Sequence, residues 1–133
     1  YDLISDTLDH QARRIFFVFG GTETKDRETI RSITENENNA IIVASYGTFS
    51  TGINIRNLHN VIFASPTKSK IRVLQSLGRG LRLGDSKSRA TLYDIADDFS
   101  YKERKNFTLN HFMERVGFYT EQEFDYEMHN VDI

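Results

Sequence analysis

Ile15-Phe16-Phe17-Val18-Phe19 is an unbroken apolar run of strand length, and a second run, Ala40-Ile41-Ile42-Val43-Ala44-Ser45, follows it along the chain. Similar runs recur at 61–64 and 90–95, with helical-looking stretches between them. Continuous rather than alternating hydrophobicity is typical of strands that are covered on both faces. The sequence therefore predicts an α/β fold with a mostly parallel sheet that is flanked by helices.

Helices are expected at both ends of the chain. The first is expected over residues 1–8, so that a doubly wound domain would lack its opening strand and the chain would be a fragment. Near the other end, Ser100 and Glu103 have capping-box spacing, apolar residues follow at helical intervals, and Gly117 suits the stop. The tail, 119–133, is too apolar to be free, so we expect it to pack on this domain or on a neighbouring one.

Length and composition fit one globular domain, because 133 residues with 38% hydrophobic content and ten Phe can build a core. We expect residues 1–99 to form the sheet domain and residues 100–133 to form a helix and tail packed on it. With no cysteine and four scattered histidines, a metal held by this chain alone is not expected. The absence of a signal-like start and of an apolar run near the roughly 18 residues of a membrane span predicts a cytoplasmic protein.

Charge is distributed unevenly along the chain, although the formal net charge is only -2. Residues 68–89 contain one acid, Asp85, and a group of basic residues: Lys68, Lys70, Arg72, Arg79, Arg82, Lys87 and Arg89. Residues 119–133 contain acids but no Lys or Arg. The first segment can therefore meet phosphate, and the tail should avoid nucleic acid.

Two loops follow the carboxyl ends of predicted strands, where parallel sheets bind ligands. Gly20-Gly21-Thr22 offers backbone amides to an anion, but a Gly-Gly turn before a helix is common, and a structural turn is favoured. The loop 46–54 has the glycine spacing of a Walker A motif, yet Ile53-Asn54 stands where Lys-Ser/Thr is required. Its hydroxyl groups suit a phosphodiester backbone, and a plain structural turn is an equal alternative.

The segment Gln75-Ser76-Leu77-Gly78-Arg79-Gly80-Leu81-Arg82 carries the sharpest functional pattern. On a helix, Arg72, Gln75, Arg79 and Arg82 lie on one stripe, and the leucines lie on another. Each glycine inside a helix costs about 1 kcal/mol relative to alanine, which indicates the close approach of a backbone or a ligand. Guanidinium groups suit a transferring phosphoryl group, whereas the plainer alternative is a solvated basic face.

These motifs resemble a known family, the second RecA-like domain of superfamily 2 helicases and translocases. Residues 75–82 resemble motif VI, and residues 45–55, ending in Thr-Gly-Ile-Asn-Ile, resemble motif V. Both motifs occur in order, separated by the strand at 61–64 and a Ser-Pro-Thr turn. Within the superfamily, residues 42–82 most resemble the recombination helicases of T-even phages, and the likeness continues through Tyr93-Asp94-Ile95-Ala96-Asp97-Asp98 into the tail. The resemblance implies a RecA-like, P-loop NTPase-type fold.

The resemblance also implies roles for individual residues in ATP binding. Arg82 would be the arginine finger that reaches the γ-phosphate of ATP bound on a partner domain, and Arg79 would assist or order it. Gln75 would help to sense the nucleotide. Gly52 and Asn54 would couple the nucleotide cleft to the nucleic-acid track.

Contact with the DNA backbone would come from hydroxyl and basic side chains of the same region. The residues expected to make it are Ser45, Thr48, Ser50, Thr51, Lys68 and Lys70. Such contacts would make DNA binding independent of sequence and strongly dependent on salt.

The chain contains no GxxxxGK[ST] loop and no Asp-Glu box. Members of the family keep those parts in an N-terminal RecA-like domain, which would hold Mg²⁺ and ATP, so this chain should not hydrolyse ATP alone. The function implied is that of the C-terminal motor domain of an ATP-dependent DNA helicase of recombination and repair, with single-stranded or branched DNA and the N-terminal domain as partners and no membrane. The alternative is a non-catalytic nucleic-acid-binding module that uses residues 68–89.

Overall fold

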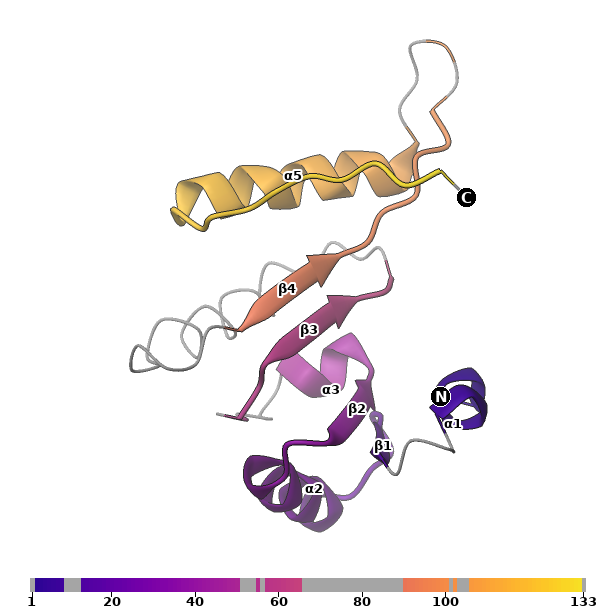
Figure 1. The fold of residues 1–133 in the computed structure, drawn as a ribbon, viewed down its shortest axis with the longest axis vertical. Coiled ribbons are helices and arrows are strands. Elements are labelled where there is room, and N and C mark those ends of the chain that lie inside the picture. The colour runs from indigo at the N-terminus through magenta and orange to yellow at the C-terminus, as the bar shows by residue number, and fades with distance from the viewer. Residues whose placement is uncertain are drawn as a thin grey trace. The chain divides into compact units, whose positions relative to one another are not determined.

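The computed structural model describes residues 2–8, 13–50, 55, 57–65, 90–100, 102 and 106–132 (Figure 1). The chain divides into two compact units, one of residues 1–60 with 72–91 and one of residues 61–71 with 92–133. The described elements in chain order are α1 (Asp2–Leu8), β1 (Arg14–Val18), α2 (Thr24–Asn36), β2 (Ala40–Ala44), α3 (Tyr46–Ser50), β3 (Asn60–Phe63), β4 (Thr91–Asp94) and α5 (Phe107–Glu121). All four predicted strands and both predicted terminal helices are therefore present.

The first unit is built on a parallel pair of strands, β1 and β2. Their register runs from Arg14 opposite Ala40 to Val18 opposite Ala44. The ladder continues for one more step, because the Ser45 backbone N–H donates to the Val18 carbonyl at 3.1 Å. Helix α2 makes the crossover that parallel strands require, and the predicted α/β fold with parallel strands is confirmed.

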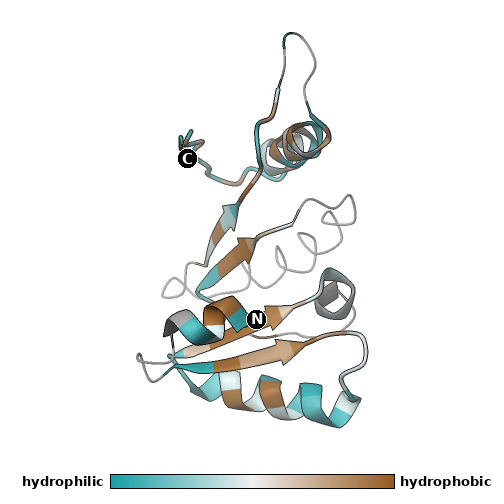
Figure 2. Cartoon of the chain, turned by 90° about the vertical axis from the view of Figure 1, so that its right-hand side faces the viewer, coloured by the Kyte–Doolittle hydropathy of each residue, from teal (hydrophilic) through white to brown (hydrophobic). Residues whose placement is uncertain are grey.

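Burial of β1 differs in part from the expectation of a strand covered on both faces. Val18 is fully buried, whereas Phe17 and Phe19 each keep 47% of their surface exposed. The two rings stack at a centroid distance of 5.4 Å. Successive side chains of a strand point to opposite faces, so Phe17 and Phe19 share the face of β1 opposite to that of buried Val18. Figure 2 shows the strands mainly in hydrophobic colours.

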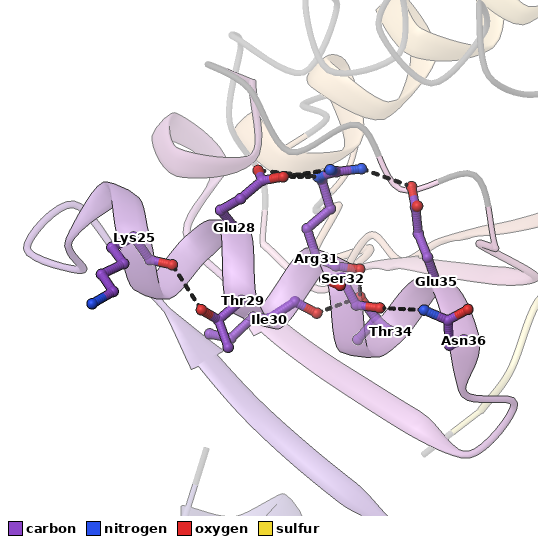
Figure 3. Close-up of polar contacts among 9 residues, drawn as sticks. All are labelled: Lys25, Glu28, Thr29, Ile30, Arg31, Ser32, Thr34, Glu35 and Asn36. Carbon is purple, nitrogen blue, oxygen red and sulfur yellow. Dashed lines mark hydrogen bonds and ion pairs between the residues drawn. The ribbon is translucent and has the colours of Figure 1, made fainter.

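Helix α2 carries a network of charged side chains on its exposed surface (Figure 3). Arg31 Nε donates to Glu28 Oε1 at 3.0 Å, and Arg31 Nη1 donates to Glu35 Oε1 at 3.1 Å. The hydrogen bonds from Arg31 lower the pKa of the Glu28 carboxyl and raise that of the guanidinium. On the opposite side Thr34 is buried, with its hydroxyl donating to the Ile30 carbonyl at 2.7 Å. The helix thus has one polar and one packed face.

The second unit combines β3, β4 and α5. The strands run parallel, since Thr91 N–H donates to the His59 carbonyl and Ile95 N–H donates to the Phe63 carbonyl, four residues further along both strands. The core contains buried residues from β3 and α5: Phe63, His111, Arg115, Val116 and Tyr119. Helix α5 contacts the end of β4, where Arg115 and Tyr119 bind Asp94. None of the helices in the described ranges is long and apolar enough to cross a membrane.

The predicted bounds of α5 are wrong at both ends. The helix begins at Phe107 after Asn106, whose side chain makes no capping bond to the helix N–H groups. The Asn106 amide and the Thr108 hydroxyl both donate to the Asp97 carbonyl at 2.9 Å, which connects the helix start to the residues after β4. Ser100 instead donates its N–H to the Asp98 carboxylate in a turn. Gly117 lies inside the helix, which continues to Glu121. The left-handed residue after the helix is Glu123, with φ of 55°.

Candidate nucleic-acid interface

The carboxyl ends of β1 and β2 lie at one edge of their sheet, because the two strands are parallel. Residues Gly20 to Thr22 follow β1 there, and the segment from Ser45 to Ser50, which includes α3, follows β2. Ligands of open α/β sheets bind at such an edge. This edge is therefore the first place to look for the predicted contacts.

The Gly20-Gly21-Thr22 turn is closed by its own neighbours. Thr22 N–H donates to the Phe19 carbonyl, and Phe19 N–H donates to the Thr22 hydroxyl, both at 3.0 Å. Arg27 donates to the Thr22 carbonyl at 2.9 Å and to the Gly20 carbonyl at 3.2 Å. These bonds connect the turn to α2 and are consistent with the structural turn that the sequence favours.

Glycine at position 21 is explained by the neighbouring ring. A Cβ on Gly21 would lie 2.7 Å from Cε2 of Phe19, whereas a Cβ on Gly20 would meet nothing within 4 Å. An alanine at position 21 would therefore clash with the Phe19 ring, whereas an alanine at position 20 would not.

Ser45 and Thr48 form a hydroxyl pair at the beginning of α3. The Ser45 and Thr48 hydroxyl oxygens lie 2.8 Å apart, and Thr48 N–H donates to the Ser45 carbonyl at 3.1 Å. Ser45 is exposed, whereas Thr48 is only 4% exposed. In this arrangement the Ser45 side chain lies exposed at the edge of the sheet, and its hydroxyl is hydrogen-bonded to that of buried Thr48.

The structure thus brings together two of the predicted site residues, and it places the backbone of Ser50 at the end of α3. The other predicted positions lie outside the described residues: Thr51, Gly52, Asn54, Lys68, Lys70, Gln75, Arg79 and Arg82. The roles of all these residues in binding ATP and DNA stay predictions.

A second polar cluster, which the sequence did not reveal as a unit, lies at the end of β4. Arg115 Nε and Nη2 donate to the two Asp94 carboxylate oxygens at 2.5 and 2.8 Å. The Tyr119 hydroxyl donates to Asp94 Oδ2 at 2.6 Å. The exposed fraction of the side chain is 7% for Asp94 and 3% for Arg115, so this is a buried, bidentate ion pair.

The surroundings of this cluster make it structural rather than catalytic. Burial, followed by the hydrogen bond to Asp94, raises the pKa of Tyr119, which keeps its hydroxyl protonated and donating. The guanidinium carbon of Arg115 also lies 5.6 Å from the Phe112 ring centroid. Three donors therefore engage the Asp94 carboxylate, and no open position for a substrate is seen among the described residues.

A family model supports the assignment of the fold. The model of the helicase conserved C-terminal domain matches residues 2–84, which include both motifs noted in the sequence. The solved structure of the C-terminal part of the Fun30 ATPase domain has a similar fold, with a TM-score of 0.60 and 17% identity over 90% of this chain and 44% of that chain.

Curated proteins give the same relationship at the level of sequence. The ATP-dependent DNA helicase UvsW of Enterobacteria phage T4 is 38% identical over an alignment that covers 100% of this chain and 28% of that protein. IRC3 of Saccharomyces cerevisiae is 30% identical over 79 residues, 59% of this chain and 11% of that protein. The chain thus spans little more than a quarter of the length of UvsW. It belongs to the helicase conserved C-terminal domain family, the second RecA-like domain of superfamily 2 helicases, and is related to UvsW.

Proposed function

We propose that this chain is the C-terminal motor domain of an ATP-dependent DNA helicase or translocase that acts in recombination and repair, including branch migration. The observation that carries the proposal is its 38% identity, over its whole length, with a protein named an ATP-dependent DNA helicase. The family match adds support, because it extends through the arginine-rich segment 75–82.

In this function the arginines of motif VI act on ATP bound by an N-terminal RecA-like domain. Arg82 is the finger that stabilises charge on the transferring γ-phosphoryl group, and Arg79 orders it. Gln75 senses the nucleotide at the same interface. Mg·ATP supplies the phosphoryl group and the divalent charge, and this chain supplies the second wall of the cleft.

DNA binding in this function uses the edge at the end of β2. Ser45 is exposed there and offers a hydroxyl to a phosphate oxygen, while buried Thr48 fixes its position. Ser50 and Thr51, and Lys68 and Lys70 further along, extend the contact along one strand. Contacts to phosphate and sugar carry no base information, so the motor is indifferent to sequence. Gly52 and Asn54 connect this contact to the nucleotide cleft.

The test is DNA-stimulated ATP hydrolysis by the full-length protein carrying Arg82→Ala. Loss of an arginine finger is expected to slow turnover by about a hundredfold or more while ATP and DNA still bind. Arg89→Ala is the matched control, since it removes the same charge from the same basic segment but lies outside motif VI. Unchanged turnover in Arg82→Ala, or a full-length protein without ATPase activity, would favour the non-catalytic module that uses residues 68–89.

A further inference from the structure

Asn57 lies just after the motif V segment and reaches back to the end of α2. Its side-chain amide Nδ2 donates to the Thr34 carbonyl at 3.2 Å and to the Glu37 carbonyl at 3.0 Å. An amide nitrogen has two hydrogens, and both are used here. Each bond spans 20 or more residues of sequence, so Asn57 joins two distant segments.

The two carbonyls that Asn57 binds lie at the C-terminal end of α2. The last four carbonyls of a helix have no partner within the helix, and Thr34 is in the last turn of α2. Glu37 is the C-cap residue, and its carboxylate pairs with Arg14 of β1 at 2.9 Å. Asn57 is therefore tied to a helix end that is itself tied to the first strand.

The beginning of the motif V segment is also attached to the rest of the first unit. The Ser45 backbone N–H joins the beginning of the segment to the Val18 carbonyl of β1, and Ile55, two residues before Asn57, is 8% exposed. The predicted contact and coupling residues Thr51, Gly52 and Asn54 lie between these two attachments in the sequence. A segment held at both ends loses less conformational freedom when it binds a ligand.

We propose that Asn57 is a positioning residue: it fixes the motif V segment to the C-terminal end of α2 and so sets how effectively DNA stimulates ATP turnover. The inference rests on the proposed helicase function. Asn57 acts through residues 51–54 and touches neither nucleotide nor DNA. The simpler alternative is that it only caps α2, in which case its loss lowers stability and nothing else.

The experiment compares Asn57→Ala with Asn36→Ala in the full-length protein. Asn36 is the matched control, because its amide also donates to a carbonyl near the end of α2, that of Ser32 at 2.8 Å, and this bond lies within the helix. For Asn57→Ala we expect the DNA concentration that gives half-maximal ATPase stimulation to rise about five- to tenfold, as the loss of two hydrogen bonds allows. In Asn36→Ala it should stay within about twofold, and the Asn57→Gln variant, which keeps the amide, should recover part of the loss.

Hydrogen exchange over residues 49–56 provides a second readout that needs no ATPase activity. We expect faster amide exchange there in Asn57→Ala and an unchanged rate in Asn36→Ala. If both variants lower the thermal midpoint equally and neither changes exchange or the DNA requirement, Asn57 is only a helix cap and the inference fails. If exchange rises in a protein that proves to have no DNA-stimulated ATPase, the proposed function fails while the link from Asn57 to motif V stands.

Discussion

Two parallel strands of this molecule end in polar side chains, with opposite results. After β2, Ser45 and Thr48 form a neutral hydroxyl pair with Ser45 exposed. At the end of β4, Asp94 is charged, buried and bound by donors from α5. The end of β2 is therefore an open edge, and the end of β4 is a closed structural cluster. A helix supplies a partner in both cases, but Thr48 of α3 leaves Ser45 exposed, whereas Arg115 and Tyr119 of α5 bury the Asp94 carboxylate.

The largest expected effect comes from removing one partner of the buried pair. Arg115→Ala leaves the Asp94 carboxylate buried without its counter-charge, which should lower the free energy of unfolding by about 3–5 kcal/mol. Urea unfolding of the chain would measure it. Arg31→Ala, which breaks the exposed ion pairs of α2, is the control and should have a far smaller effect. Similar losses in both variants would contradict the assignment of Arg115 to a buried, bidentate pair.

Tyr119→Phe should cost less, because it removes only the hydroxyl that donates to Asp94. Hydrogen bonds to charged groups contribute about 1.5–3 kcal/mol, and the packing of the ring is kept. The same urea titration applies. An unchanged midpoint would mean that the two bonds from Arg115 already satisfy the carboxylate.

Stability should also fall at high pH through Tyr119. Its pKa is raised above the ordinary value of 10.0, so the folded state keeps the proton while the unfolded state loses it. The stabilisation is complete below pH 10 and is lost progressively above it. Thermal midpoints of the wild-type chain between pH 9 and 11 should fall more steeply than those of Tyr119→Phe. Parallel curves would show that the pKa of Tyr119 is the same in the folded and unfolded states.

In the hydroxyl pair, we expect Thr48 to affect stability and Ser45 to affect DNA binding. Thr48→Val removes a buried hydroxyl and should lower the free energy of unfolding by about 1 kcal/mol.

Ser45→Ala should reduce the affinity of the full-length protein for single-stranded DNA by about two- to fivefold, a modest loss, because one hydrogen bond among many phosphate contacts is removed. Fluorescence anisotropy at fixed salt would measure it. If Ser45→Ala binds DNA as well as wild type, the edge after β2 is not the contact surface.

The smallest effect is expected in the glycine turn at the same edge. Gly21→Ala must displace the half-exposed Phe19 ring and should destabilise the chain by less than about 1 kcal/mol. Gly20→Ala meets no atom and should be neutral or slightly stabilising, by up to about 1 kcal/mol. A difference of the opposite sign would show that backbone conformation, rather than the Phe19 ring, selects these glycines.

The sequence predicted the strands because each is a continuous apolar run, a local signal that needs no knowledge of its neighbours. It placed the start of α5 at Ser100 because capping-box spacing is also local. The observed start lies at Phe107, and the contacts beside it are not local, since Asn106 and Thr108 donate to the Asp97 carbonyl 9 and 11 residues away. Local patterns therefore indicated the elements but not the bounds of this helix.

The buried cluster was missed for a related reason. Asp94 finds its partners 21 and 25 residues further along the chain, and nothing in the sequence marks Arg115 or Tyr119 as belonging to a strand end. The spacing of Arg115 and Tyr119, one helical turn apart, is a usable signal only once Asp94 is known to face α5. Motif V and motif VI were found because whole motifs, rather than single contacts, resemble those of a known family.

The beginning of the acidic tail contacts Tyr119. The tail turns back at Glu123, the Phe124 N–H donates to the Tyr119 carbonyl at 2.9 Å, and the ring of Tyr126 lies 6.2 Å from that of Tyr119. The tyrosine whose hydroxyl binds Asp94 thus has its ring shielded by the first residues of the tail. Residues 123–126 therefore contribute contacts to Tyr119, and we expect a chain shortened to residue 122 to unfold at a lower urea concentration than one shortened to residue 127.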